Sequence, residues 1–191
     1  MKFRRNKVAY QTRENIHKTL AVVVGSFFHN PPSSHVIFAP ECGGGHRILF
    51  FSTETRSRAT NYCWPDLVII QNNEARIIVE VEQSGIVSPA KIGSKLLPVL
   101  LSSCLRNEDI DSGTIPISRG ATLIQVVNTE LLKPATRKLR QYENLEADIR
   151  RLLPIGCITH YFLLPVLADP APPYGIEKYY PLLEAVNQSL N

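Results

Sequence analysis

Three features typical of other protein classes are missing from this chain of 191 residues. Its four cysteines, Cys42, Cys63, Cys104 and Cys157, include no Cys-x-x-Cys pair, which excludes the spacing of a standard zinc finger or redox motif. No uninterrupted apolar run reaches the roughly 18 residues that a membrane-spanning helix needs. The apolar stretch near the amino terminus lacks the small-residue cleavage site of a signal peptide. We therefore expect reduced thiols, a cytoplasmic location and no membrane partner.

Charge is also scarce, because Lys, Arg, Asp and Glu together make up 20% of the residues. The 44% apolar content excludes a disordered or fibrous chain, and a net charge of +4 permits a nucleic-acid partner without identifying one. At this length we expect a single domain, spanning residues 1–168. We expect the proline-rich segment and short helix of residues 169–191 to pack on that domain or at a dimer interface.

Apolar periodicity and turn residues predict an α/β protein, with a mixed central sheet flanked by helices on both faces. Ser88 and Pro89 are typical of a helix amino terminus. The runs 64–70 and 75–82 are apolar on both faces, which indicates a hairpin at the centre of the sheet. Residues 107–120 have the composition of an acidic, polar loop. The expected helices span 10–28, 88–105, 134–153 and 179–190, and the other expected strands span 35–39, 48–51, 122–127 and 157–164.

Three acids stand out within that apolar hairpin, namely Asp66, Glu80 and Glu82. Glu80 and Glu82 are two residues apart and therefore share one face of their strand. Asp66 joins them only if the turn has three or five residues, because a two-residue turn would place Val79 opposite Asp66. Clustered carboxylates repel one another in an apolar setting, and a divalent cation such as Mg²⁺ or Mn²⁺ relieves that repulsion.

The same residues carry a family resemblance. Pro65-Asp66, then Glu80-Val81-Glu82, then a helix with Lys91 and Lys95, resemble the active-site hairpin of the PD-(D/E)xK nuclease superfamily. The resemblance covers residues 64–105. It implies a restriction-endonuclease-like αβββαβ core and Mg²⁺-dependent hydrolysis of phosphodiester bonds in DNA, with Mn²⁺ able to substitute.

The resemblance also implies a set of metal ligands. Asp66 would be the central ligand, Glu80 the second carboxylate and the Val81 carbonyl a third ligand. Glu14 on the first helix would be the extra acidic ligand that this superfamily often has there, and Glu41 competes for that role. Glu14 could equally form a surface pair with Lys18 at helical spacing.

This chain departs from the superfamily pattern at Glu82, where the pattern has a lysine. Some restriction enzymes of this fold carry Glu there, and Glu82 would then assist or orient the attacking water. In other branches, including the Uma2-like endonucleases, the lysine comes from the following helix. Lys95 better matches that spacing, whereas Lys91 lies nearer the end of the strand, so either could supply the catalytic cation.

Basic residues form two further groups with a possible role in binding phosphate. Arg56 and Arg58 lie in the loop that leads into Asp66, and a second group on a later helix comprises Arg137, Lys138 and Arg140. A charged helix face is also compatible with simple exposure to solvent. Two polar residues in later strands have no assigned role: Gln125 could face the site or satisfy a neighbouring backbone group, and His160 is expected to be packed or hydrogen-bonded rather than catalytic.

These observations predict a metal-dependent endodeoxyribonuclease, of the type II restriction-like kind, that acts on double-stranded DNA. One chain offers one such site, so cleavage of both strands favours a homodimer. The alternative is a catalytically inactive DNA-binding module or partner subunit with the same fold, which the missing strand lysine would explain.

Overall fold

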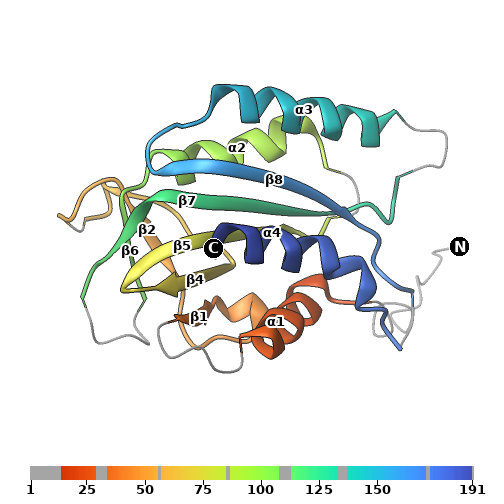
Figure 1. The fold of residues 1–191 in the computed structure, drawn as a ribbon, viewed down its shortest axis with the longest axis horizontal. Coiled ribbons are helices and arrows are strands. Elements are labelled where there is room, and N and C mark those ends of the chain that lie inside the picture. Colours follow the sequence, from red (N-terminus) through yellow and green to blue (C-terminus); the bar gives the residue numbers. More distant parts are fainter. Residues whose placement is uncertain are drawn as a thin grey trace, which may run out of the picture.

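The computed structural model describes residues 14–28, 34–55, 57–84, 87–107, 113–132, 137–170 and 173–190. Within these residues an eight-stranded mixed sheet forms the centre of the molecule (Figure 1). Helices α1 (Ile16–Phe27) and α4 (Tyr180–Leu190) pack on one face, and helices α2 (Pro89–Leu100) and α3 (Lys138–Leu152) pack on the other. None of these helices is both long and apolar enough to cross a membrane. The predicted α/β class, with a mixed sheet flanked by helices, is confirmed.

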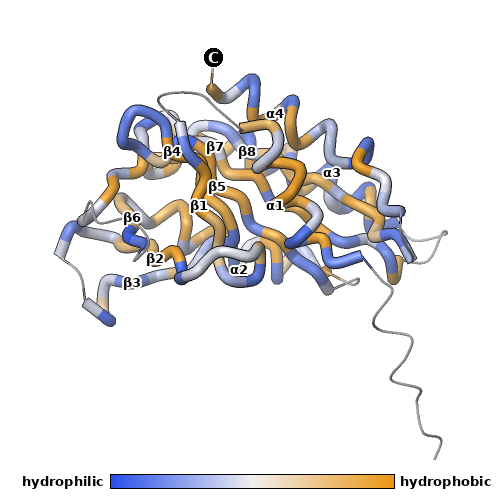
Figure 2. The backbone as a smooth tube through the Cα atoms, turned by 90° about the horizontal axis from the view of Figure 1, so that it is seen from below, coloured by the Kyte–Doolittle hydropathy of each residue, from blue (hydrophilic) through white to orange (hydrophobic). Residues whose placement is uncertain are grey.

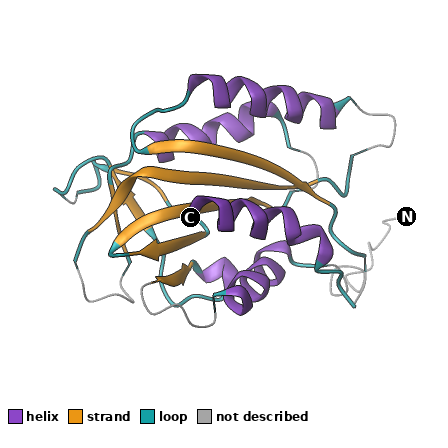
Figure 3. Ribbon diagram, in the orientation of Figure 1, coloured by secondary structure: helices purple, strands orange, loops and turns teal. Residues whose placement is uncertain are grey.

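The sheet combines an antiparallel meander with parallel strands, and Figure 3 shows the strands between the two helical layers. β1, β4 and β5 pair antiparallel in that order, β7 pairs parallel to β5, and β8 pairs parallel to β7. β6, β2 and β3 extend the sheet from the first part of β7. The bounds are β1 Ser34–Phe38, β2 Leu49–Phe51, β3 Asn61–Cys63, β4 Leu67–Gln71, β5 Glu74–Glu82, β6 Cys104–Arg106, β7 Ile115–Asn128 and β8 Ile158–Val166.

The hairpin of β4 and β5 is buried on both faces, as its apolar composition predicts. Leu67 and Ile69 belong to the core under α1 and α4, whereas Val68 and Ile70 belong to the core under α2 and α3. Figure 2 shows the resulting apolar band along the central strands. A carboxylate on either face of this hairpin must therefore lie among apolar groups unless it stands at a strand end.

Several predicted boundaries differ from those in the structure. The first helix begins at Ile16 with Asn15 as its N-cap, and positions 10–13 lie outside the described residues. Ser88 caps α2 as predicted, since its Oγ accepts a hydrogen bond from the backbone N–H of Lys91 at 3.2 Å. The prediction that this helix continues to residue 105 is wrong, because residues 104–106 form β6 and pair with β2.

The acidic loop predicted over residues 107–120 is wrong in its second half. β7 begins at Ile115, and Ile115 and Ile117 are buried in the core. The intervening Pro116, Ser118 and Gly120 concealed this strand, because such residues are common in turns. Its pairing with β6 supplies the backbone partners that make an irregular-looking sequence a strand.

The end of the chain is part of the same fold. Tyr179, Leu182 and Val186 at α4 are buried in one core with Ile16 and Leu20 of α1. The short 3-10 helix η3 (Glu177–Tyr179) precedes α4, and a second one, η2 (Pro40–Cys42), follows β1. The last described helix therefore covers the sheet beside the first.

Candidate active site

The turn between β4 and β5 differs from the predicted one. Gln71 pairs with Glu74, so Asn72 and Asn73 form a two-residue turn, and both have positive φ angles, of 54° and 62°. This is the backbone shape that asparagine tolerates and that a tight hairpin needs. The prediction of a three- or five-residue turn is therefore wrong.

A β-bulge restores the register that the tight turn would have lost. Ile70 pairs with Ala75 but Ile69 pairs with Ile77, so Arg76 is an extra residue in β5. Beyond the bulge Leu67 pairs with Val79, and one further step along this register sets Asp66 across from Glu80. The two acids thus come to the same face by a bulge and not by the turn.

Asp66 is held in place by hydrogen bonds at the start of β4. Its Oδ2 accepts the backbone N–H of Val81 at 2.7 Å, and its own carbonyl accepts the backbone N–H of Ala39 at 2.8 Å. His17 of α1 lies on the other side, with Nε2 3.5 Å from Oδ1. Asp66 is 8% exposed and lines a cleft. One carboxylate oxygen is therefore fixed on β5, while the other faces His17.

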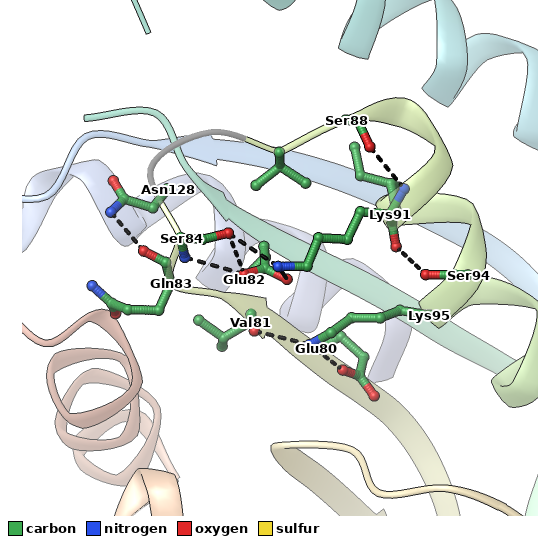
Figure 4. Close-up of polar contacts among 12 residues, drawn as sticks. Glu80, Val81, Glu82, Gln83, Ser84, Ser88, Lys91, Ser94, Lys95 and Asn128 are labelled. Carbon is green, nitrogen blue, oxygen red and sulfur yellow. Dashed lines mark hydrogen bonds and ion pairs between the residues drawn. The ribbon is translucent and has the colours of Figure 1, made fainter. Parts of the chain in front are cut away.

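Glu80 lies deeper and is paired with Lys95. The Lys95 Nζ lies 3.1 Å from Glu80 Oε2 and donates a second hydrogen bond to the Val81 carbonyl at 3.2 Å (Figure 4). Burial raises the pKa of Glu80 to about 7; Asp66 and Glu82 raise it further and Lys95 opposes the shift. Burial disfavours the Lys95 ammonium, but the attraction of Glu80, Asp66 and Glu82 outweighs it and raises the Lys95 pKa. The lysine is therefore charged at neutral pH.

Glu82 points to the same side of β5 but has its own partners. Lys91 Nζ lies 2.9 Å from Glu82 Oε2, and Ser84 donates to Oε1 through its hydroxyl at 2.6 Å and its backbone N–H at 3.1 Å. Partial burial would raise the pKa of Glu82, but the hydrogen bonds from Ser84 and Lys91 lower it overall. The two candidate lysines are thus assigned to different acids, Lys91 to Glu82 and Lys95 to Glu80.

Asp66, Val81, Glu82 and Lys95 border a cleft of about 340 Å³, whereas Glu80 and Lys91 line a small void together with Glu82 and Lys95. The wall of the cleft includes several residues that the sequence did not single out: His17, Arg47, Trp64 and Gln83. Trp64 directly precedes the Pro65-Asp66 motif, and this position was the one available signal for it. Nothing in the sequence distinguishes His17 from its helical neighbours, because its contact with Asp66 depends on how α1 packs. Glu41, the competing acid, also lines this cleft.

The donor atoms of the cleft suit a hard divalent cation. Among the described residues, no three His, Cys, Asp or Glu side chains converge as a metal-binding group. Two carboxylates and a backbone carbonyl remain, from Asp66, Glu80 and Val81. Mg²⁺ and Mn²⁺ are commonly held by one or two carboxylates together with water and phosphate oxygens. The donor set fits such an ion, and the Lys95 ammonium now contacts two of its members.

Glu14 is held away from this set by a group that we call the Glu14 clasp, consisting of Glu14, Asp169, Lys178 and Tyr179. Glu14 Oε1 accepts the Tyr179 hydroxyl at 2.6 Å, Oε2 accepts the Asp169 backbone N–H at 2.8 Å, and Lys178 Nζ pairs with Oε2. The carboxylate is 2% exposed and fully occupied. It is therefore neither placed as a metal ligand nor paired with Lys18 at the surface.

The predicted phosphate-binding residues fall on two separate parts of the chain. Arg56 lies outside the described residues, and Arg58 is exposed just before β3. Arg137 and Arg140 are exposed at the start of α3, and Lys138 is half-buried beside them.

Gln125 and His160 do not line the cleft itself, although Gln125 pairs with Glu80 between β5 and β7 and lines the small void that Glu80 also lines. Gln125 is buried, donates to the Ile92 carbonyl at 3.3 Å and accepts from the Tyr161 hydroxyl at 2.6 Å, so it satisfies its neighbours. His160 is exposed and therefore not packed, but its Nδ1 lies 2.9 Å from the Thr159 hydroxyl, so it is hydrogen-bonded, which is the other predicted alternative.

No known protein family, curated protein or solved structure matches this chain. Function must be inferred from the chemistry of the cleft. The cleft combines the buried Asp66 with a charged lysine, which holds the buried Glu80, and with a wall of aromatic and basic side chains. Such an arrangement can bind a cation and an anionic ester side by side, with one acid whose pKa lies near neutrality.

Proposed function

We propose that the protein is a Mg²⁺-dependent DNA endonuclease with a restriction-endonuclease-like core. The observation that carries this proposal is the position of Lys95, whose ammonium reaches from α2 to Glu80 and Val81 beside Asp66. The two acids and the lysine of the superfamily pattern would then be Asp66, Glu80 and Lys95, although β5 carries Glu82 at the position where that pattern has a lysine. The element order α1, β1, β4, β5, α2, β7 also follows an αβββαβ order, with β2, β3 and β6 as additions.

The proposal assigns a role to each group of the cleft. Asp66, Glu80 and the Val81 carbonyl would hold the metal ion. A bound Mg²⁺ would neutralise charge on the scissile phosphate and favour ionisation of a water molecule. The charged Lys95 donates hydrogen bonds to the oxygens on which negative charge develops. Glu82, kept ionised by Ser84 and Lys91, accepts a hydrogen bond from the attacking water and orients it.

The substrate assignment is double-stranded DNA cut by a homodimer, as a type II restriction-like enzyme would do. One chain has one acid–acid–lysine set, so breaking both strands at one place calls for two copies related by a two-fold axis. The exposed Arg58, Arg137 and Arg140 would contact phosphates and set the position of the duplex without reading its sequence.

Cleavage of plasmid and duplex oligonucleotides in Mg²⁺ or Mn²⁺ tests the proposal. We expect the unmodified protein to nick or linearise plasmid, and we expect Asp66→Asn to lower the rate at least about 100-fold. The matched control is Asp148→Asn, since Asp148 is an exposed residue of α3 that pairs with Arg151 and does not line the cleft. Failure of the unmodified protein to cleave in either ion, or equal cleavage by Asp66→Asn, would contradict the proposal.

The Lys95–Glu80 ion pair is also the observation that favours the alternative, a DNA-binding module without catalysis. It places a positive charge against Glu80 in the metal-free protein and so offsets part of the cost of burying that acid. Calorimetry with Mn²⁺ separates the two functions. Affinity for DNA with neither metal-dependent heat nor cleavage would identify the binding module, whereas Mn²⁺ heat that Asp66→Asn removes would support the nuclease.

A further inference from the structure

We propose that Trp64 is a stacking platform for an unpaired or extruded nucleobase next to the cleavage site, so that among duplex substrates the protein prefers DNA with an unpaired or extruded base beside the scissile bond. This proposal rests on the proposed nuclease function and specifies its substrate. Trp64 is 54% exposed, an unusual state for the largest side chain type. It lines the cleft of Asp66 and also a second hollow that adjoins it.

The second hollow has the dimensions and chemistry of a base-binding site. Its volume is about 590 Å³, and its walls come from the β2 and β3 extension of the sheet: Leu49, Phe51, Ser57, Arg58, Asn61 and Trp64. Pockets for planar organic ligands have mostly apolar walls with a few polar groups that fix orientation. Leu49, Phe51 and Trp64 supply the apolar walls here, and Asn61 and Arg58 supply hydrogen-bond donors.

Arg47 makes a cation–π contact with the Trp64 indole on the side of the cleft. Its guanidinium carbon lies 5.2 Å from the centre of the Trp64 ring, and Arg47 lines the cleft but not the hollow. Arginine on one aromatic face makes the ring a firmer stacking surface on the other. Arg47 thus places positive charge over the ring and Arg58 places it in the wall of the hollow, where each could contact a phosphate next to a stacked base.

The position of Trp64 along the chain connects the hollow to the reaction centre. Trp64 precedes Asp66 by two residues, so their Cα atoms are at most about 7 Å apart. A base on Trp64 and a phosphate at Asp66 would therefore belong to the same nucleotide or to neighbouring ones. Bases inside a duplex are already stacked and paired, and only an unpaired or extruded base can enter such a hollow. An overhang, a flap or a bulge would meet this requirement.

The binding test uses the fact that Trp64 is the only tryptophan of the chain. Its fluorescence is measured in EDTA, where no metal-dependent cleavage occurs, against a blunt duplex, the same duplex with a thymidine overhang, and the same duplex with an abasic overhang. We expect quenching with the thymidine overhang alone, and about tenfold or more tighter binding than to the abasic overhang. The two overhangs have equal charge, so equal quenching and equal affinity would overturn the proposal.

Variants separate stacking from simple attraction of phosphates. Labelled oligonucleotides read by anisotropy should show that Trp64→Leu abolishes the preference for the thymidine overhang, whereas Trp64→Phe keeps part of it. Tyr180→Leu, which changes an equally exposed aromatic on α4, should keep it fully. Loss of the preference in Tyr180→Leu, or its retention in Trp64→Leu, would overturn the proposal.

The two proposals fail in different ways. If the protein quenches with the thymidine overhang but cleaves no DNA in Mg²⁺ or Mn²⁺, stacking is supported and the nuclease function is not. If it cleaves blunt duplex and overhang substrates at equal rates without base-dependent quenching, the nuclease function is supported and stacking is overturned.

Discussion

Two buried glutamates of this protein each pair with a lysine, but they differ in the number of further hydrogen bonds that they receive. Glu14 and Glu80 are 2% and 4% exposed, and each pairs with one lysine, Lys178 and Lys95 respectively. Glu14 also receives hydrogen bonds from the Tyr179 hydroxyl and the Asp169 backbone. Among the described residues Glu80 receives one hydrogen bond, from Lys95, and burial raises its pKa to about 7. A buried acid with every oxygen satisfied stabilises a fold, whereas an under-satisfied acid beside a cleft is suited to chemistry.

The largest effects should come from removing each acid in turn. We expect Glu80→Gln to lower cleavage at least about 100-fold with little change in stability, because it removes a charge that burial disfavours, while the amide oxygen can still accept the hydrogen bond of the partly exposed Lys95. We expect Glu14→Ala to retain the cleavage rate of the folded protein but to lower the free energy of unfolding by about 2–4 kcal/mol, because Lys178 and Tyr179 lose their buried partner. Urea unfolding and plasmid cleavage check both expectations, and the reverse pattern would exchange the roles of the two acids.

The pH dependence of stability should sharpen the contrast at Glu80. Its pKa rises on folding from the ordinary 4.5 to about 7, so between these values the native state binds more protons than the unfolded state. Unfolding free energy therefore falls as pH rises through this range, by about 3 kcal/mol from this residue in the metal-free protein.

Urea unfolding from pH 4.5 to 7.5 in EDTA measures this contribution. Glu80→Gln should remove it, and Glu184→Gln, at an exposed position of α4, should leave it in place. If Glu80→Gln had the same pH dependence of stability as the unmodified protein, the prediction would be wrong, because folding would then not raise the pKa of Glu80.

The smallest effect should follow from the second lysine of α2. Lys91 is about half exposed and pairs with Glu82, and exposed ion pairs contribute about 0–1 kcal/mol. We expect Lys91→Met to change the free energy of unfolding by less than about 1 kcal/mol and to reduce cleavage less than Lys95→Met does. Parallel urea unfolding and cleavage rates of the two variants check this ranking. A larger loss of cleavage in Lys91→Met would assign the catalytic cation to Lys91.

The fold class and the place of the site were predictable because they depend on local patterns. The apolar runs around Asp66 and Glu80 identified a central hairpin, and Ser88 identified the start of the helix that carries both lysines. The prediction that Asp66 lies across from Glu80 assumed an odd-length turn, whereas a bulge at Arg76 produces this register. The Arg76 bulge depends on the partners of β5, since the pairing with β7 also shifts between Ala75 and Ile77, and no pattern within the hairpin reveals that.

The position of Glu14 could not be predicted for a related reason. Its partners Asp169 and Lys178 lie more than 150 residues further along the chain. Spacing within one helix suggested Lys18 in their place, because only near neighbours are visible to such an argument. Lys95 could be predicted as one of two candidates because it lies 15 residues after Glu80, across a single strand-to-helix connection.

The Glu14 clasp has a consequence for how the protein emerges from the ribosome. Glu14 and Lys178 are 164 residues apart, so at about 5–20 residues per second Lys178 is made about 8–30 seconds after Glu14. Throughout that time Glu14 lacks its Lys178 partner, and α1 lacks α4, the helix that packs beside it on the same face of the sheet. The Glu80–Lys95 pair, 15 residues apart, can form within about a second or a few of its synthesis. The Glu80–Lys95 pair can thus assemble early, whereas the clasp cannot close until Lys178 has been made.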